Sequence, residues 1–329
     1  MAFFKKSKQE DVQPATETPA APVEVFDTDF TPVNLDELAS EVIDTPKYAY
    51  WPQVAKKFFS NKITIVMLVI LIAVMGMAFI QPLFSGYNLN STAGINDFAA
   101  RYNAPSAKYW FGTDGDGKSL FDAIWAGAKT SMSISIISTL ITTVIGTIVG
   151  AFWGVSPKMD RVMLEVYNVI SNVPQLLIIM VLSYSFGAGF WNLIFAMNCT
   201  AWIGTAYGVR VQVMIQRQRE YNVASKTLGT PITKIITRNI LPYLTSYIVT
   251  GVSVSLPSFV STEVFLSFLG VGLSANTPSL GRIIAKSATY MSTFPYLFWF
   301  PVAALLLITV PVYIVGQNLA DATDPRTHM

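Results

Sequence analysis

Residues 63–83 read ITIVMLVILIAVMGMAFIQPL and contain no charged side chain. A helix that crosses the hydrocarbon core of a bilayer needs about 20 mostly apolar residues, and this segment meets that requirement by itself. Lys62 lies immediately before the segment, and Pro82 marks its end. The segment therefore predicts a transmembrane helix, and a protein whose solvent is partly lipid.

Five further apolar segments predict a chain that crosses the membrane repeatedly. They cover approximately residues 131–155, 162–186, 190–209, 243–269 and 296–316. Pro174 is expected to kink the second of them, and residues 187–189 (GAG) to form a tight turn after it. Only 13% of all residues are charged, against about 25% in soluble proteins. The predicted fold class is an all-α membrane protein with six transmembrane helices.

The positive charges predict the orientation of this fold. With the N-terminus placed in the cytoplasm, 16 of the 22 Lys and Arg residues fall on the cytoplasmic side and 6 on the other. Because cytoplasmic loops carry the excess of Lys and Arg, both termini are predicted to be cytoplasmic, N-in and C-in. Two long loops result, an external one over residues 84–124 and a cytoplasmic one over residues 210–241.

The N-terminal part of the chain differs in composition from the rest. Residues 1–45 contain 10 of the 20 acidic residues and few large apolar side chains, so they are predicted to be a disordered acidic cytoplasmic tail. Residues 46–62 combine Trp51 and Phe58 with Lys56 and Lys57, which predicts an interfacial helix. Residues 63–329 are then expected to form the transmembrane domain.

The rare residue types exclude several functions. The chain has one cysteine, Cys199, and one histidine, His328. This excludes a disulfide framework, a cysteine-based zinc cluster and the catalytic designs that need several of these residues. A formal net charge of +2 produces no strong field toward nucleic acid. The sequence thus predicts no catalytic residue, no metal, no cofactor bound by this chain and no nucleic-acid partner.

One short stretch imitates a nucleotide-binding motif. Residues 112–119 read GTDGDGKS and fit the phosphate-loop pattern GxxxxGK[ST]. We reject nucleotide binding because no buried strand precedes the stretch, two carboxylates would face the phosphates, and the predicted location is external. Asp114, Asp116 and Asp122 leave a weak calcium site open, although Trp125 stands where an EF-hand loop needs glutamate.

The predicted cytoplasmic loop has the pattern of two helices joined by a sharp turn. Residues 220–228 favour a helix, and Gly229 suits the left-handed position that ends one. Thr230 and Pro231 suit the N-cap and first turn of the next helix, and Pro242 marks the start of the following membrane helix. A rigid basic hairpin of this kind is either a docking device for another protein or an ordinary positively charged loop.

This loop resembles that of the permease subunits of ATP-binding-cassette importers, in their dipeptide, oligopeptide and nickel branch. The branch pattern is close to EYVxAAxxLG followed by HxLP. The matching residues are Glu220, Tyr221, Ala224, Leu228, Gly229, Leu241 and Pro242. Ser225 stands in place of an alanine, and Asn222, Val223 and Asn239 also depart from the pattern.

Three further segments are similar to motifs of the same branch. Residues 110–119 resemble FGTDxxGRD, residues 263–281 resemble ExxLSFLGLG followed by PxxSWG, and residues 319–326 resemble LxDxLDPR. The departures are Lys118, Ser119, Leu280 and Thr323. The resemblance extends over residues 55–326 and is greatest to the C-type permease of oligopeptide importers.

The resemblance implies a type I importer architecture that moves peptides, above all oligopeptides, into the cytoplasm by alternating access. The implied location is the bacterial plasma membrane, and the implied partners are a second homologous permease, two cytoplasmic ATPases that bind ATP and Mg²⁺, and an extracellular peptide-binding protein. The chain itself would hydrolyse no ATP. The residues expected to couple it to the ATPase are Glu220, Tyr221, Ala224, Ser225, Leu228, Gly229, Leu241 and Pro242.

Two residues of the fifth predicted span are candidates for a gate. Glu263 either faces the translocation path or ties the helix to the outer loop, and its position near the outer end favours structural hydrogen bonding. Pro257 is expected to kink the same helix. No substrate-binding residue is assigned from the sequence.

Three other functions remain as alternatives. The first is a nickel or other small-solute permease of the same branch. The second is an ion-coupled secondary carrier, but such carriers place ionisable groups in mid-membrane, where the predicted spans hold few, chiefly Glu165 and Glu263 near their ends. The third is a membrane enzyme, for which no catalytic set is visible.

Overall fold

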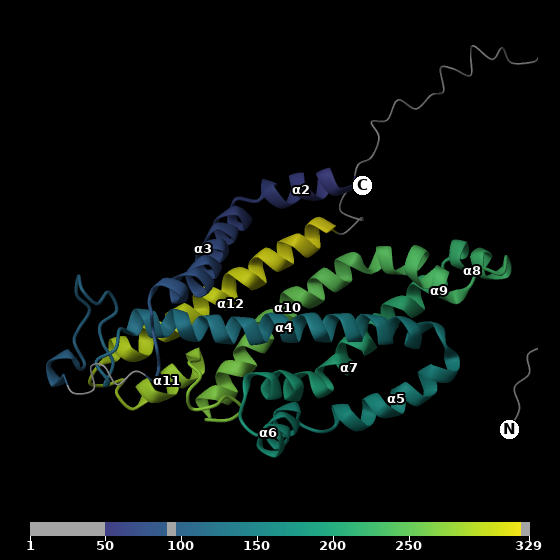
Figure 1. Cartoon of the computed structure of the whole chain (residues 1–329). Coiled ribbons are helices and arrows are strands. Elements are labelled where there is room, and N and C mark those ends of the chain that lie inside the picture. Colours follow the sequence, from purple (N-terminus) through teal and green to yellow (C-terminus); the bar gives the residue numbers. More distant parts are fainter. Residues whose placement is uncertain (1–49, 91–96, 324–329) are drawn as a thin grey trace, which may run out of the picture. The chain divides into compact units, whose positions relative to one another are not determined.

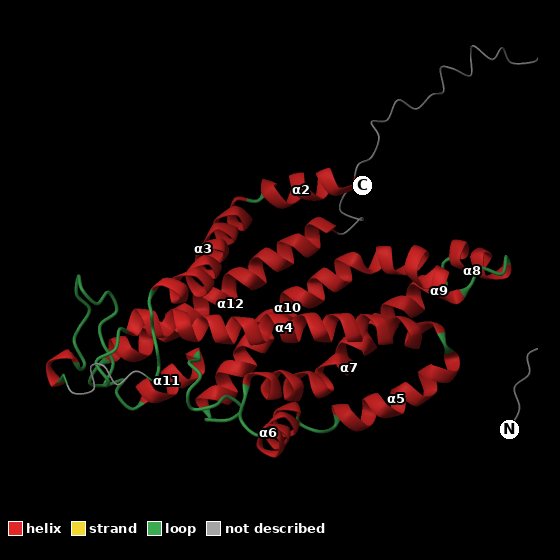
Figure 2. Ribbon diagram, viewed as in Figure 1, coloured by secondary structure: helices red, strands yellow, loops and turns green. Residues whose placement is uncertain are grey.

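The computed structural model describes residues 50–90 and 97–323. The described secondary structure is helical (Figure 2), apart from one isolated β-bridge between Thr113 and Ser119. The predicted disordered tail over residues 1–45 lies outside the described residues. An all-α fold is confirmed.

The helices follow one another closely along the chain, as Figure 1 shows. The first part comprises α2 (Tyr50–Ser60), α3 (Lys62–Phe84), a 3₁₀ turn (Phe98–Ala100), α4 (Leu120–Val155), α5 (Pro157–Ser171), α6 (Gln175–Phe186) and α7 (Phe190–Arg217). The second part comprises α8 (Glu220–Thr227), α9 (Ile232–Lys234), a π-helix η4 (Ile235–Ile240), a 3₁₀ helix η5 (Leu241–Leu244), α10 (Thr245–Phe268), α11 (Leu280–Ala288) and α12 (Pro295–Thr323).

Four helical stretches of the described chain are long and apolar enough to cross a membrane: α3, α4, the run from Ile232 to Phe268, and α12. A fifth results if α5 and α6, which are bent by 81° at their junction, together form one span. The predicted kink at Pro174 is therefore a full break between two helices. The predicted count of six spans, and the N-in and C-in orientation, stay predictions.

Several helices extend beyond the predicted bounds, and one helix was not predicted. Helix α7 continues to Arg217, eight residues past its expected end and into the predicted cytoplasmic loop, and α12 continues to Thr323. Helix α4 begins at Leu120, eleven residues before the expected start, because Ser119 caps it by accepting a hydrogen bond from the Asp122 amide. The loop before α4 therefore ends at residue 119. Helix α11 was not predicted, since its nine residues are too short to cross a bilayer; Ser279 caps its first turn.

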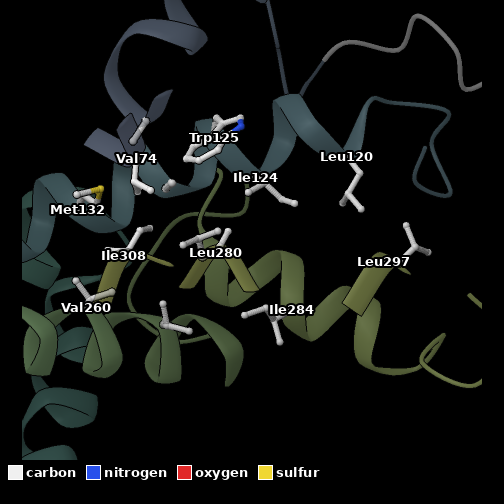
Figure 3. Close-up of a cluster of buried hydrophobic side chains, with 14 residues drawn as sticks. Val74, Leu120, Ile124, Trp125, Met132, Val260, Leu280, Ile284, Leu297 and Ile308 are labelled. Carbon is white, nitrogen blue, oxygen red and sulfur yellow. The ribbon is translucent and has the colours of Figure 1, made fainter. Parts of the chain in front are cut away.

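A buried cluster joins α3, α4, α10, α11 and α12 (Figure 3). Its members point toward one another from helices that are distant in sequence, and they include Val74, Ile124, Val260, Ile284 and Ile308. A second cluster lies among α4, α6, α7 and α10, with Ile134, Ile179 and Leu193 at its centre. These two clusters hold the long helices in one packed unit.

Helices α4 and α7 approach most closely along a row of glycines. Gly146, Gly150 and Gly154 are spaced four residues apart on α4, so they lie on one face of the helix. A side chain at Gly150 would place its Cβ 2.4 Å from the carbonyl oxygen of Ala206 in α7. Small residues let two backbones meet in this way, which is a frequent basis of helix association in membranes.

Candidate functional site

The hairpin that follows α7 has the sharp turn predicted from the sequence. Helix α8 ends at Thr227, and Gly229 adopts φ +78°, the left-handed conformation that glycine favours. The Gly229 amide donates to the Lys226 carbonyl over 3.0 Å, and the Thr230 amide to the Ser225 carbonyl over 3.1 Å. These bonds satisfy carbonyls at the helix end, and the predicted role of Gly229 as the residue that ends α8 is confirmed.

The second arm of the hairpin differs from the expected α-helix. Pro231, not Thr230, occupies the N-cap position, and no side chain caps α9. Helix α9 has only three residues and continues as a π-helix and a 3₁₀ helix before α10 begins at Thr245. Pro242 lies inside η5, where its missing N–H and its ring prevent a regular α-helical ladder.

Buried aliphatic side chains anchor the base of the hairpin. Ile235, Ile236 and Ile240 of η4 and Leu244 of η5 form a cluster with Ala151 of α4 and with Val209 and Val213 of α7. Because interiors of this kind are close-packed, the base is part of the same packed unit as the adjoining turns of α4 and α7.

Two asparagines fasten α8 to its surroundings. The side-chain amide of Asn222 is 2% exposed and donates to the Gln216 carbonyl over 2.9 Å. Asn239 of η4 donates to the Ser225 hydroxyl over 3.4 Å. Both positions depart from the importer pattern in the sequence, and the structure gives each a local partner. Helix α8 is therefore held to the end of α7 and to the second arm of the hairpin.

The hairpin exposes several large apolar side chains. Leu228 is 85% exposed, and Tyr221, Val223 and Ile232 are also exposed. A single exposed apolar residue is ordinary on a protein surface, but several of them on one short hairpin mark a contact surface. We call these residues the hairpin tip. The tip and the anchored base together suit a rigid element that binds another protein.

An ion pair that the sequence did not predict lies near this base. Arg210 of α7 and Asp160 of α5 face each other in a bidentate arrangement, with Nε–Oδ1 and Nη2–Oδ2 distances of 2.5 and 3.0 Å. The indole of Trp153 in α4 donates to the same Asp160 Oδ1 over 2.8 Å. The Arg210 guanidinium also lies 5.5 Å from the ring centres of both Trp153 and Tyr207. Three helices thus meet at one charged group.

No motif in the sequence links Asp160 to Arg210. Their separation of 50 residues leaves no local signal. The only indication of the ion pair in the sequence was that Asp160 and Arg210 lie at two predicted helix ends on the cytoplasmic side of the membrane.

Glu263 is completely buried in α10. Its Oε1 accepts a hydrogen bond from Ser267 over 2.7 Å, and Ser131 of α4 and Ser279 before α11 lie beside the carboxyl group. The Ser131 hydroxyl in turn accepts from the Leu280 amide over 3.4 Å. This position suits a tie between α4, α10 and α11 better than a place on a translocation path.

In the stretch that imitates a phosphate loop, backbone amides donate hydrogen bonds to a side chain of the same loop. Asp114 Oδ1 accepts from the amides of Asp116 and Lys118 over 3.0 and 2.9 Å, so these amides are already paired and unavailable to a phosphate. Lys286 of α11 approaches Asp116 to 2.6 Å and Asp114 to 3.5 Å. The hydrogen bond from Lys286 holds the pKa of the Asp116 carboxyl below its usual value. Within the described residues no three His, Cys, Asp or Glu side chains are grouped for a metal ion.

Comparison with known proteins decides the family. Residues 145–329 match the family described as binding-protein-dependent transport system inner membrane component. This chain belongs to that family. Residues 49–105 match the N-terminal transmembrane domain of oligopeptide transport permease C. The predicted relation to permease subunits of ATP-binding-cassette importers is therefore confirmed, and this inner membrane component is a multi-pass protein of the plasma membrane.

Individual relatives extend over almost the whole chain. The oligopeptide transport system permease protein AmiD of Streptococcus pneumoniae is 55% identical over 90% of this chain and 96% of its own length. The oligopeptide transport system permease protein OppC of Bacillus subtilis is 30% identical over 90% of this chain and 96% of its own. The dipeptide transport system permease protein DppC of Bacillus subtilis is 31% identical over 87% and 89%.

The structure of this inner membrane component groups most of the predicted coupling residues. The members on α8 and its C-terminal turn are Glu220, Tyr221, Ala224, Ser225, Leu228 and Gly229. Leu241 packs at the hairpin base, and the adjacent Pro242 is exposed. The rings of Tyr221 and Tyr243 lie 6.0 Å apart and connect the two arms. Pro257 and Glu263 lie in α10, outside the hairpin, and the functional roles of all these residues stay predictions.

Removing one member of the ion pair in this inner membrane component is expected to destabilise it. In the Asp160→Asn variant, Arg210 is left 11% exposed without its carboxylate, and breaking a buried pair costs about 3 kcal/mol. Thermal unfolding of the purified protein in detergent would show the loss as a lower midpoint. Glu165→Gln, an exposed change on the same helix, is the matched control. Equal midpoints for both variants would contradict a stabilising role for the pair.

Proposed function

We propose that this chain is one of two transmembrane subunits of an ATP-driven importer of oligopeptides. The observation that carries the proposal is the 55% identity, over nine tenths of the chain, to a permease of an oligopeptide transport system. The other relatives are likewise named as permeases of oligopeptide and dipeptide transport systems. The transported substrate is accordingly a peptide.

The hairpin supplies the connection to the energy source in this proposal. Its base is packed into α4 and α7, while its tip exposes apolar side chains. A partner that binds the tip can therefore displace the membrane helices as rigid bodies. The partners are two cytoplasmic ATPases that hold ATP and Mg²⁺, a second homologous permease and an extracellular peptide-binding protein. The chain is N-in and C-in, so that the hairpin faces the ATPases.

The alternatives have less support. The relatives named above transport peptides, which disfavours a nickel permease. An ion-coupled carrier needs ionisable groups on its path, but Asp160 and Arg210 bind each other and Glu263 is enclosed by serines. Alternating access driven by a partner ATPase requires only two states with different affinity for ATP and peptide.

Deletion of the gene from a bacterium that carries this importer tests the proposal. We expect uptake of a labelled pentapeptide to fall to the background level, while uptake of the free amino acids and of nickel ions stays unchanged. Plasmid expression of this chain should restore it, and restored uptake should persist when an ionophore collapses the ion gradients but ATP is maintained. Uptake that follows the ion gradient, or loss of nickel uptake alone, would overturn the proposal.

A further inference from the structure

The break between α5 and α6 interrupts a segment whose length and composition fit a bent membrane span or a re-entrant loop. Irregular backbone at membrane depth is tolerated only where protein buries it or where it lines a water-filled cavity. A cavity of about 460 Å³ lies directly against the break. Asn172, Val173 and Pro174 line one side of it, and Thr200 and Gly204 of α7 line another. The break therefore borders a recess large enough to admit water-sized molecules.

A second cavity of about 160 Å³ continues from the first, since Gln175 and Ala201 line both. Its walls come from α4, α6, α7 and α10. Most of its lining is polar, with Gln175, Thr142, Thr205, Ser255, Ser258 and Thr262. Gln175, the first residue of α6, thus stands at the junction of the two cavities.

The chemistry of the combined lining is neutral. Neither set of lining residues contains Asp, Glu, Lys, Arg or His. Hydroxyl and carboxamide groups both donate and accept hydrogen bonds, which is the requirement for binding a peptide main chain with its alternating N–H and C=O groups. A fixed charge in a site with little water would instead select peptides by their side-chain charge.

The Gln175 carboxamide is free to bind a ligand, whereas two of the hydroxyl groups in the second cavity already have partners. Thr142 already donates to Asn198 over 2.6 Å, and Thr262 to the Ser258 carbonyl over 2.9 Å. The Gln175 side chain is exposed and makes no hydrogen bond to another of the described residues. Its carboxamide can therefore turn toward either cavity.

We propose that the two cavities, joined at Gln175, form a subsite that binds the main chain of the peptide during its passage. The inference rests on the proposed function, because it takes a peptide as the cargo. The subsite holds any peptide by its backbone and is indifferent to the charge of the side chains. Gln175, at the junction of the two cavities, is the lining residue at which an introduced charge should abolish this indifference.

Gln175→Glu tests the subsite in cells that lack the chromosomal gene and carry the complete transporter. Three labelled pentapeptides of alanine are compared, with Ala, Asp or Lys at the centre. The native chain should take up all three at rates within about twofold. We expect Gln175→Glu to lower uptake of the Asp peptide relative to the Lys peptide about tenfold, which corresponds to about 1.4 kcal/mol. Ser185→Asp, an acid on the same helix outside both cavities, should leave the three rates equal.

The outcomes separate the inference from the proposed function. Equal rates for the three peptides in Gln175→Glu, at native membrane levels, would overturn the subsite while leaving peptide import intact. Failure of the native chain to take up any of the peptides would overturn the proposed function instead.

Thiol labelling covers the case in which Gln175→Glu does not reach the membrane. In a Cys199→Ser background, which removes the single native thiol, Gln175→Cys should react with a charged, membrane-impermeant methanethiosulfonate, and added pentapeptide should slow the reaction. Leu177→Cys lines neither cavity but an adjacent hollow with a wholly apolar lining, so it should stay unreactive toward the charged reagent. A cysteine at 175 that does not react, or whose reaction the peptide leaves unchanged, would overturn the subsite.

Discussion

Leu228→Glu is expected to abolish peptide uptake while leaving the amount of the chain in the membrane unchanged. Leu228 is 85% exposed and belongs to the hairpin tip, so the substitution should alter the stability of the isolated chain by no more than about 0.5 kcal/mol. If the tip binds the ATPase, however, a carboxylate would be placed in an apolar contact. Loss of one such anchor costs about 2 kcal/mol or more, equivalent to at least about 30-fold in affinity.

Two measurements are needed to interpret Leu228→Glu. Co-purification of the ATPase with the tagged permease reports binding, and uptake of a labelled pentapeptide by whole cells reports transport. Leu228→Met preserves an apolar side chain of similar size and should retain both properties. Uptake and ATPase binding within twofold of the native chain in Leu228→Glu would exclude the hairpin tip as the docking element.

Gly150→Val is expected to prevent the chain from accumulating in the membrane. An added Cβ would lie 2.4 Å from the Ala206 carbonyl oxygen and 2.8 Å from the Val209 Cβ, and the first of these is a backbone atom that cannot turn away. Overpacking of a core costs about 1–3 kcal/mol when side chains can adjust. Because the α4 and α7 backbones must separate here, we expect a cost above that range.

The effect of a glycine-to-valine substitution should depend on where the glycine lies. Gly251 also lies in a long helix, α10, but no atom lies within 4 Å of an added Cβ. Gly251→Val should therefore accumulate close to the native level. Immunoblots of washed membranes compare the two variants, and thermal unfolding in detergent ranks any protein that remains. Native levels of Gly150→Val would contradict the close α4–α7 contact.

The features that the sequence predicted well are those with a local physical cause. Residues 63–83 form most of α3 because an uninterrupted apolar run satisfies its backbone hydrogen bonds only as a helix in lipid. Gly229 ends α8 because glycine adopts positive φ without steric cost. Pro174 interrupts a helix because it lacks an N–H group. In each case a short stretch contains the whole cause.

The predictions that failed concerned where a helix begins, which type of helix forms and how two helices are oriented. The start of α4 was placed too late because apolar composition reports the membrane-embedded part of a helix and not the capped turns beyond it, here begun by Ser119. The π-helical arm from Ile235 to Ile240 was expected to be an ordinary helix, since Thr230 and Pro231 match the start of one. The angle of 81° between α5 and α6 could not be predicted from Pro174. A proline indicates that a helix is interrupted, but it does not fix the direction of the following helix.

The sequence by itself determined that this chain is helical, that it is built for a bilayer and that it belongs among the importer permeases, because apolar runs and short motifs are local properties. Only the tertiary structure decided that Arg210 binds Asp160, that Gly150 meets Ala206, and that Gln175 joins two neutral cavities. These contacts join residues many turns apart in the chain. They depend on how whole helices pack, and no single segment specifies that packing.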